Sequence, residues 1–219
     1  MSREAILRRL GGVLDKRGAR AARFARVAGR LDATGRTKLR PGDREGAAVL
    51  GRFVDRLRAL EVEVSELPGR GALPAAISSY LGAAGLPKRL RRGTDARLDA
   101  LAWGEAPTLR VDVGAARGED STGLSWASAA VAETGTLVVA SAPASPTTLA
   151  FLPDTHLVVV EAANVVATYE EALALLAAPP MPRVLNFITG ASRTADIGGR
   201  VVMGAHGPRR LTVFLLNEP

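Results

Sequence analysis

The amino-acid sequence predicts an α/β fold, in which short strands and helices alternate around a largely parallel or mixed central sheet. Two apolar, β-branched runs, at residues 137–139 and 157–160, are typical of strands buried on both faces. Elsewhere apolar residues recur at the spacing of amphipathic helices, as they do over residues 50–60. A chain of 219 residues suits one domain, or one domain with a helical extension.

The first part of the chain is predicted to be helical. An amphipathic stripe near the N-terminus consists of Ile6, Leu7, Leu10, Val13 and Leu14. Residues 29–46 contain several glycines and a Pro-Gly pair, which indicates an irregular connection before the second amphipathic helix. We therefore expect a helical extension over residues 1–45, packed on an α/β domain that occupies residues 46–219.

Strands and helices then alternate towards the C-terminus. Further short strands are expected at residues 62–64, 87–90, 109–113, 184–188 and 211–216. Helical segments are expected at residues 73–81, at residues 98–103 and after Thr168. Thr168 and Glu171 have the spacing of a capping box, in which the hydroxyl and the carboxylate accept hydrogen bonds from backbone N–H groups at the start of a helix.

The composition excludes several kinds of site. The sequence has no cysteine, so it offers no disulfide, no thiolate nucleophile and no cysteine ligand for zinc or an iron–sulfur cluster. An electron-transfer cofactor of that kind would therefore have to sit on another polypeptide. His156 and His206 are too few for an all-histidine metal site, although carboxylates could complete one, so no metal site is assigned and the cofactor stays open.

The ends and the apolar runs of the sequence indicate a cytoplasmic protein. Charges are spread through the first ten residues, unlike the apolar core of a signal peptide. No apolar run approaches the roughly 18 residues that a membrane-spanning helix needs. A cytoplasmic location is therefore expected.

The net charge of +7 is unevenly distributed. Residues 1–100 hold 22 basic and 11 acidic residues, whereas residues 101–219 hold 7 basic and 11 acidic residues. Such asymmetry can indicate nucleic acid or acidic partners. However, the basic residues are scattered and few aromatic side chains lie between them to stack on bases. A solvated, arginine-rich helical surface is favoured over nucleic-acid binding.

Common nucleotide and metalloprotease motifs are missing. The sequence contains neither a phosphate loop of the G-x-x-x-x-G-K-[ST] kind nor an H-E-x-x-H pair. Gly69-Arg70-Gly71 is similar to the start of a dinucleotide fingerprint, but Pro74 stands where the third glycine belongs. This stretch is interpreted as a loop.

A first candidate site segment is Glu133-Thr134-Gly135-Thr136, which runs into the predicted strand at residue 137. A glycine between two threonines lets a backbone come close to a ligand, and Glu133 could act as a base, a nucleophile or a hydrogen-bond acceptor. The alternative is an ordinary turn at the start of a strand, with Glu133 exposed.

A second candidate segment, residues 189–197, directly follows the predicted strand at 184–188. Ligands of open α/β sheets bind beyond the carboxyl ends of strands. Ser192, Arg193 and Thr194 suit a carboxylate or phosphate, because an arginine can bind either with two parallel hydrogen bonds. The alternative is that a hydroxyl caps a helical turn and Arg193 pairs with Asp196.

A third candidate segment, Gly204-Ala205-His206-Gly207-Pro208, precedes the last predicted strand. A neutral His206 imidazole could serve there as a general acid or base. A Gly-Pro turn whose histidine bonds to the backbone is the alternative.

Five motifs together resemble a known family. In order they are residues 132–136, Leu152-Pro153-x-x-His156, Thr168-x-Glu170-Glu171-Ala172-Leu173, residues 190–197 with the sequence Gly-Ala-Ser-Arg-Thr-Ala-Asp-Ile, and His206-Gly207-Pro208. This order is similar to that of LUD domains, and in particular to the lactate utilization protein C family. The matching elements span about residues 110–219. One departure is Gly198-Gly199, where members of the family often have an acidic residue.

The resemblance implies a fold related to the NagB/RpiA/CoA-transferase group. It also implies a role in oxidising L-lactate to pyruvate beside iron–sulfur partner subunits, and it is compatible with a catalytic, a substrate-binding or a scaffolding role. The expected ligand is a small carboxylate or a cofactor in the sheet crevice. The expected ligand-binding residues are Thr134, Gly135, Thr136, Ser192, Arg193 and Thr194, and the expected catalytic residues are Glu133, Asp196 and His206.

Two other functions are kept as alternatives. One is a stand-alone enzyme of the CoA-transferase type, or an ATP-dependent ligase, acting on a small acid; it rests on fold relationship alone. The other is a regulatory or binding module that uses the basic N-terminal half.

Overall fold

The computed structural model describes residues 2–15, 22, 24–26, 29, 46–177, 181–197 and 200–217. It divides the chain into two compact units, residues 1–42 and residues 43–219. The first unit contains helix α1 (Arg3–Asp15), which confirms the predicted N-terminal helix. Most of the connection expected at residues 29–46 lies outside the described residues.

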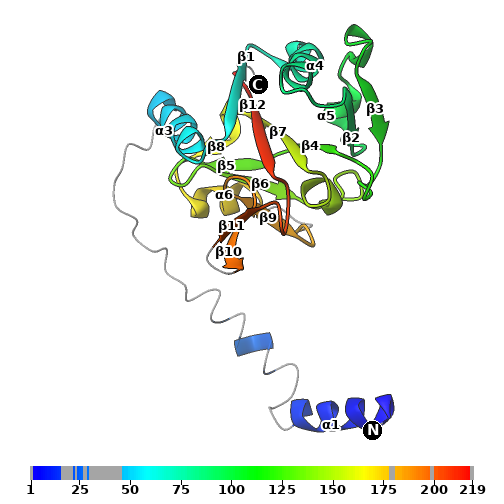
Figure 1. Cartoon of the computed structure of the whole chain (residues 1–219). Coiled ribbons are helices and arrows are strands. Elements are labelled where there is room, and N and C mark those ends of the chain that lie inside the picture. The colour runs from blue at the N-terminus through cyan, green and yellow to red at the C-terminus, as the bar shows by residue number, and fades with distance from the viewer. Residues whose placement is uncertain are drawn as a thin grey trace. The chain divides into compact units, whose positions relative to one another are not determined.

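The second unit is built on a six-stranded parallel sheet (Figure 1). Its strand order is β1 (Glu63–Leu67), β12 (Arg210–Leu216), β7 (Thr155–Glu161), β4 (Thr122–Trp126), β2 (Arg89–Arg92) and β3 (Arg110–Val113). Every neighbouring pair in this sheet is parallel. The first and the last strands of the unit, β1 and β12, are therefore direct neighbours.

A smaller, mixed sheet forms a second layer. Its strand order is β8 (Val165–Val166), β5 (Ala129–Val131), β6 (Thr136–Ala140) and β9 (Leu185–Ile188). The chain passes from the large sheet into the small one directly after β4, where Ala127 N donates to Val159 O at 2.8 Å. A separate antiparallel hairpin consists of β10 (Arg193–Ile197) and β11 (Arg200–Met203).

Helices cover the sheets. The α-helices are α3 (Gly46–Ala59), α4 (Leu73–Ala83), α5 (Ala96–Asp99) and α6 (Tyr169–Leu175). Short 3-10 helices are η1 (Arg70–Ala72), η2 (Trp103–Glu105), η3 (Thr147–Ala150) and η4 (Ala162–Asn164). Thr168 and Glu171 form the predicted capping box at the start of α6.

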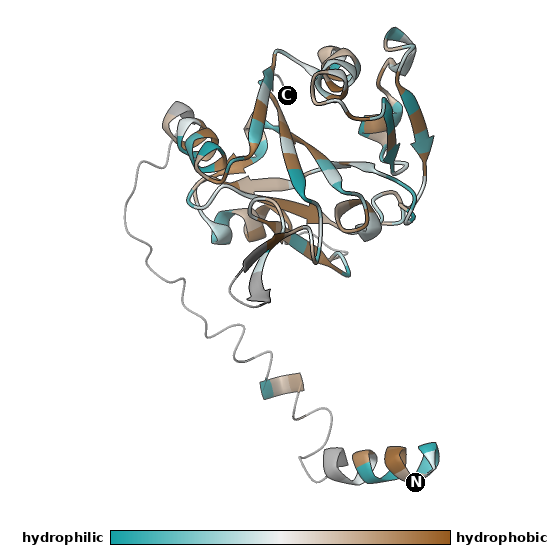
Figure 2. Cartoon of the chain, viewed as in Figure 1, coloured by the Kyte–Doolittle hydropathy of each residue, from teal (hydrophilic) through white to brown (hydrophobic). Residues whose placement is uncertain are grey.

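The hydrophobic core lies on both faces of the large sheet. One cluster joins α3 and the small sheet to one face, through residues such as Phe53, Leu137 and Val213. A second cluster joins α4 and α5 to the opposite face, through residues such as Ile77 and Phe214. Hydrophobic colour is accordingly concentrated on the central strands (Figure 2). Apolar runs such as residues 157–160 are continuous because both of their faces are buried.

The predicted α/β class with a largely parallel sheet is confirmed. The helical turn expected at residues 98–103 is instead two short helices that overlap its two ends, α5 and η2. The sequence did not predict β4, β5, β8, β10 or β11. Of these, β5 and β8 belong to the smaller sheet, and β10 and β11 form the hairpin. The strands of both structures are short, with two to five residues each.

Candidate functional site

The turn between β5 and β6 carries the first candidate segment. Gly135 has φ +71°, in the left-handed region, and its N–H donates to Val131 O at 3.0 Å. A Cβ at this position would lie 3.0 Å from the Cβ of Arg56 and 3.2 Å from the backbone nitrogen of Leu57. The turn therefore packs directly against the last part of α3, and glycine is required for both the backbone angle and the close approach.

Four hydroxyl groups form a network behind this turn. Thr136 Oγ1 lies 2.7 Å from Thr134 Oγ1, 2.8 Å from the hydroxyl of Tyr169 and 2.7 Å from Thr189 Oγ1. Thr134 Oγ1 also donates to Tyr169 at 3.0 Å. Each hydroxyl can donate one hydrogen bond and accept others. The four groups therefore provide hydrogen-bond partners for one another, including the fully buried hydroxyl of Thr136. The network ties the first candidate segment to α6 and to the end of β9.

Glu133 occupies the outer side of the same turn. Its backbone N–H donates to Ala167 O at 3.2 Å, which fixes the turn to the segment between β8 and α6. Its side chain is exposed. An exposed carboxylate on a fixed backbone is accessible to a ligand, as a base, a nucleophile or an acceptor.

The second and third candidate segments are hydrogen-bonded to each other. Ser192 N donates to Pro208 O at 2.9 Å, and Gly204 N donates to Ser192 O at 2.9 Å. The backbone N–H of His206 donates to Ser192 Oγ at 3.4 Å, and the His206 side chain is exposed. Ser192 is therefore the residue around which residues 204–208 fold.

Arg193 forms an ion pair that the sequence did not predict. Its guanidinium contacts the carboxylate of Glu61, just after the end of α3, and the two side chains are 46% and 78% exposed. The sequence analysis had offered Asp196 as the alternative partner. Asp196 lies in β10, but its side chain is outside the described part of the structure. Thr194, which pairs with Val202 in the hairpin, is half-buried.

The end of α3 brings these segments into one region. Gly135 lies against Arg56 and Leu57, and an ideal Cβ on Gly190 would lie 3.6 Å from the Cβ of Leu60. Glu61 then reaches Arg193. Among the described side chains, no hydrogen bond or ion pair joins Glu133 to Arg193 or to His206, so the contact between the segments runs through α3 and through Thr136 and Thr189.

This region lies at the amino end of the large parallel sheet. Pro208, which binds Ser192, comes just before β12, and Arg209 N donates to Asp154 O just before β7. The strand that precedes residue 189 is β9, which belongs to the mixed small sheet. The rule for the carboxyl ends of parallel strands therefore does not apply to this segment. The expectation that residues 189–197 follow a strand of the parallel sheet was wrong.

His156, part of one of the five motifs, lies outside this region. It is 1% exposed at the start of β7, and its Nε2 lies 2.9 Å from Ser125 Oγ on the neighbouring strand. Burial away from water lowers the pKa of His156 to about 3. The imidazole is therefore neutral in the folded chain and holds two strands together.

A groove, the arrangement of possible metal ligands and the character of the helices complete the description of the surface. A groove of about 970 Å³ is lined by parts of residues 140–148, 175–176 and 181–184, with Ala115, and includes none of the predicted site residues. Within the described ranges, no three histidine, acidic or cysteine side chains are placed to hold a metal ion. In the same part of the chain, no helix has the length and apolar character needed to cross a membrane.

Three residues of the region escaped the sequence analysis as site residues. Thr189 belongs to the second segment, but the sequence gives no sign that its hydroxyl meets Thr136. Tyr169 follows the capping threonine, and nothing in the sequence pattern indicates clearly that its hydroxyl belongs to the network. Glu61 gave no signal, since a glutamate between a helix and a strand normally points into water.

Comparisons with known proteins agree with the motif pattern. A family model described as the LUD domain matches residues 51–216. Lactate utilization protein C from Deinococcus radiodurans is 31% identical over 191 residues, which cover 80% of this chain and 83% of that protein. Lactate utilization protein C from Anoxybacillus flavithermus is 30% identical over 122 residues, 56% of this chain.

Coverage of the relatives differs. The chain spans about half the length of two curated relatives, 54% of the Anoxybacillus protein and 43% of one from Geobacillus sp. WCH70. A crystal structure of a DUF162 family protein from Deinococcus radiodurans is similar in fold, with a TM-score of 0.60 and 24% identity over 78% of this chain and 98% of that one. Since the family model covers most of the chain and the motifs occur in order, this protein belongs to the LUD domain family.

Proposed function

We propose that this protein works in lactate utilization as a subunit that binds a small carboxylate beside the end of α3. The observation that carries the proposal is Arg193, which stands between Ser192 and Thr194 in the chain and whose exposed guanidinium contacts the carboxylate of Glu61. Its relatives named lactate utilization protein C suggest the substrate class. An arginine stays charged at any working pH and its fork of N–H groups matches carboxylate oxygens.

In this proposal Arg193 holds the carboxylate of the ligand. Hydroxyl groups orient the rest of the ligand, and they belong to Thr134, Ser192 and Thr194. The backbone around Gly135 and the buried Thr136 keep the first segment in place through the network described above. Glu133, Asp196 or His206 takes up the proton that leaves the substrate, and the exposed Glu133 and His206 side chains are open to a ligand.

Oxidation of L-lactate to pyruvate releases two protons and two electrons. The side chains of this protein can accept protons, but the sequence has no cysteine to hold an iron–sulfur cluster. We therefore propose that iron–sulfur partner subunits receive the electrons, and that the complex works in the cytosol. The packing of the helical extension, residues 1–45, on the rest of the chain remains a proposal as well.

The second candidate function is a CoA-transferase-like enzyme acting on a small acid. The observation that favours it is the exposed carboxylate of Glu133 on a turn fixed by backbone and hydroxyl contacts. A carboxylate so placed can attack an acyl group as a nucleophile. Attack of Glu133 on the thioester carbonyl of an acyl-CoA would break its C–S bond, release CoA as the thiolate and leave a mixed anhydride on Glu133. Mass spectrometry of the intact chain after incubation with an acyl-CoA would detect such a covalent adduct.

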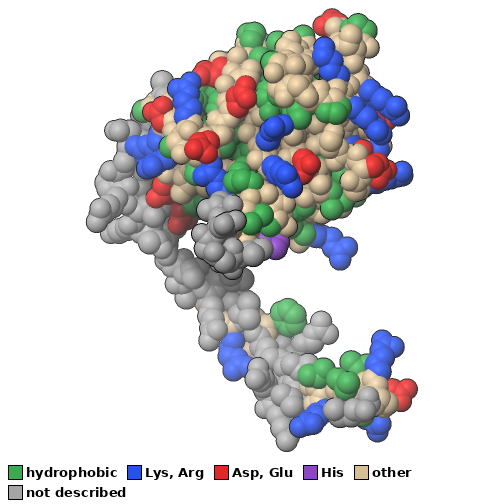
Figure 3. All heavy atoms as spheres, viewed as in Figure 1, with side chains coloured by type: hydrophobic (Ala, Val, Ile, Leu, Met, Phe, Trp, Pro, Cys, Tyr) green, Lys and Arg blue, Asp and Glu red, His purple; other side chains and the backbone are tan. Residues whose placement is uncertain are grey.

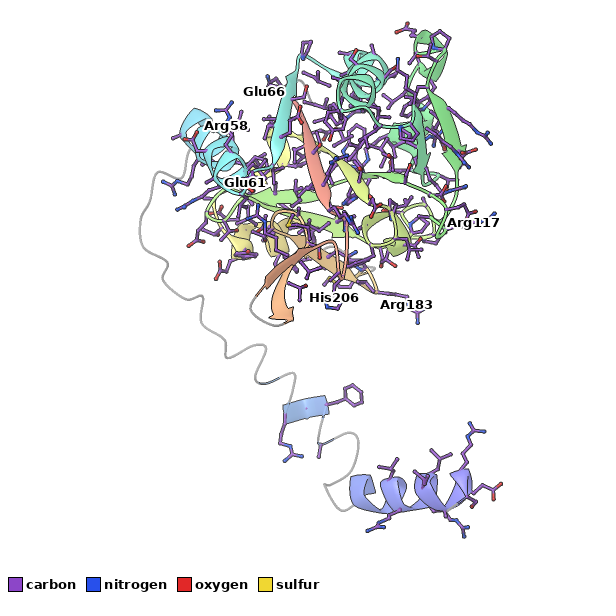
Figure 4. All side chains as sticks on the ribbon, in the orientation of Figure 1. Arg58, Glu61, Glu66, Arg117, Arg183 and His206 are labelled. Carbon is purple, nitrogen blue, oxygen red and sulfur yellow. The ribbon has the colours of Figure 1, made fainter. Side chains whose placement is uncertain are left out.

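The variant Arg193→Gln tests the lactate proposal. We expect it to lose roughly 2–3 kcal/mol of L-lactate binding, since a charge-assisted hydrogen-bonded pair is removed. Growth on lactate of a deletion strain that carries this variant should fall accordingly. The matched control is Arg117→Gln, an exposed arginine in another part of the domain (Figure 4). Equal lactate binding by wild type and Arg193→Gln would refute the assignment.

A further inference from the structure

We propose that Glu61 is a stand-in carboxylate: it occupies the position on Arg193 that the carboxylate group of a ligand takes, and ligand binding displaces it. This inference rests on the proposed function, because it assumes that Arg193 binds the ligand. It names the ligand class at this position, a carboxylate, from the group that the chain itself places there.

The backbone of Glu61 is the first observation. Among the described residues, Glu61 is the only residue other than glycine with a positive φ, at 58°. It follows the end of α3, where Glu61 N donates to Arg58 O at 2.9 Å and Val62 N donates to Leu57 O at 2.9 Å. Helices that end with a left-handed residue usually have glycine there, because a side chain at that position costs free energy. A glutamate at this position therefore costs local stability and places a carboxylate beside Arg193.

The exposure of the ion pair is the second observation. The side chains of Arg193 and Glu61 are 46% and 78% exposed. Ion pairs in such surroundings contribute little to stability, since water competes for both groups and two long side chains lose freedom. A pair of this kind holds the arginine in place without blocking it, and a dissolved carboxylate can exchange with Glu61 at small cost.

The surroundings of the pair are the third observation. Gly190 packs against Leu60, so the backbone next to Glu61 is held against the second candidate segment. Ser192, next to Arg193, is fixed by its backbone bonds to the third segment. Rotation of the Glu61 side chain towards water is therefore enough to free Arg193, while the main chain around it keeps its place.

Neighbouring side chains provide a matched control. Glu66 on β1 is also exposed, at 47%, and its carboxylate lies 4.0 Å from the guanidinium of Arg58 on α3. Figure 4 labels Glu61, Glu66 and Arg58 in the same part of the molecule. Glu61→Gln and Glu66→Gln thus remove the same charge from two nearby exposed ion pairs, only one of which involves Arg193.

The experiment is calorimetric titration of the full chain with L-lactate and, separately, with acetate. Wild type is compared with Glu61→Gln, Glu66→Gln and Arg193→Gln, after melting curves have shown that each variant is folded. We expect Glu61→Gln to bind both carboxylates about two- to fivefold more tightly than wild type, the range that corresponds to a weak exposed ion pair. Glu66→Gln should bind them as wild type does, and Arg193→Gln should bind both about 30- to 150-fold more weakly.

The outcomes separate this inference from the proposed function. Equal or weaker binding by Glu61→Gln would overturn the stand-in role and make Glu61 a positioning residue or an unrelated surface charge. Tighter binding of acetate without any binding of L-lactate would support the stand-in role and refute lactate as the ligand. Binding of neither carboxylate by wild type and by Glu61→Gln would overturn both.

Discussion

The most deeply buried ionisable side chain outside the candidate site is that of His156. Its ring bonds to Ser125 through Nε2, while Nδ1 has no hydrogen-bond partner among the described atoms. A second proton on this ring would place a charge in the buried interior, away from water. The folded chain therefore resists protonation of His156, and acid should destabilise it through this one residue.

The prediction for His156 concerns stability against pH. The unfolded chain takes up a proton near the ordinary pKa of 6.5, whereas the folded chain does so only near pH 3. Stability is therefore complete above pH 6.5 and falls as the pH drops towards 3, by about 2 kcal/mol between pH 7.5 and pH 5. Urea unfolding of wild type and His156→Gln at both pH values measures it.

The variant His156→Gln separates this effect from that of the other titratable groups, because it should lose about 2 kcal/mol of the wild-type dependence on pH. A wild-type stability that is flat from pH 7.5 to pH 5 would show that His156 is not held neutral by burial.

At the scale of residues, the sequence did not predict which side chains the candidate site residues contact. It singled out Arg193 and Ser192, and the structure places both next to the third segment or the end of α3. The sequence suggested Asp196 as a partner of Arg193, because without a known fold only residues close in sequence can be expected to lie close in space. Glu61, which the structure pairs with Arg193, is 132 positions away.

At the scale of elements, the turn before β6 depends on one glycine. We expect Gly135→Ala to destabilise the chain by about 1–3 kcal/mol, since alanine is strained at a positive φ and its Cβ would press on α3. Because the turn carries Glu133, the same change should also weaken ligand binding. Thermal or urea unfolding provides the measurement.

Gly118 provides the matched control for that change. An ideal Cβ on Gly118 meets nothing within 4 Å. Gly118→Ala should therefore leave stability within about 0.5 kcal/mol of wild type, as is usual for surface substitutions. If the two alanine variants were equally stable, the packing of the turn against α3 would carry no energetic weight.

Strand β4 illustrates why some elements escaped the sequence analysis. All five of its residues are buried, yet the sequence Thr-Gly-Leu-Ser-Trp has neither alternation nor a β-branched apolar run. The cause lies in its neighbours: a Cβ on Gly123 would lie 2.4 Å from the carbonyl oxygen of Leu149, in η3. Long-range packing therefore selected a glycine where local preference would favour a branched side chain.

At the scale of the whole molecule, the core belongs to the second unit. All three hydrophobic clusters are formed by residues from Val49 onwards. We expect a fragment of residues 43–219 to fold by itself and to unfold in one cooperative transition. Circular dichroism during thermal unfolding checks this, with the full chain as reference.

The same measurement tests the packing of the helical extension. If residues 1–45 pack on the domain as predicted, the fragment should melt at a lower temperature than the full chain. An identical melting temperature would contradict that packing, and a fragment without a cooperative transition would contradict the independence of the core.

The fold class and the family followed from the sequence, because periodicity and ordered motifs are local features. The strand order did not, because it depends on pairings between distant segments. Charge also had to be placed by the structure: on the visible face of the second unit, basic and acidic side chains are intermixed (Figure 3). The charge asymmetry of the sequence therefore gives no single-signed surface on that face.

The pairing of β1 with β12 has a consequence for how the chain is made. β1 is an edge strand whose only partner in the sheet is β12, with Glu63 beside Thr212 and Leu67 beside Leu216. On a ribosome, β1 emerges long before the residues that pair with it. The edge of β1 stays without a partner until β12 has been translated and has left the ribosome, so β1 can pair only once all of residues 63–216 are available. Contacts of such long sequence separation slow folding, and the interval is when this protein is most exposed to aggregation.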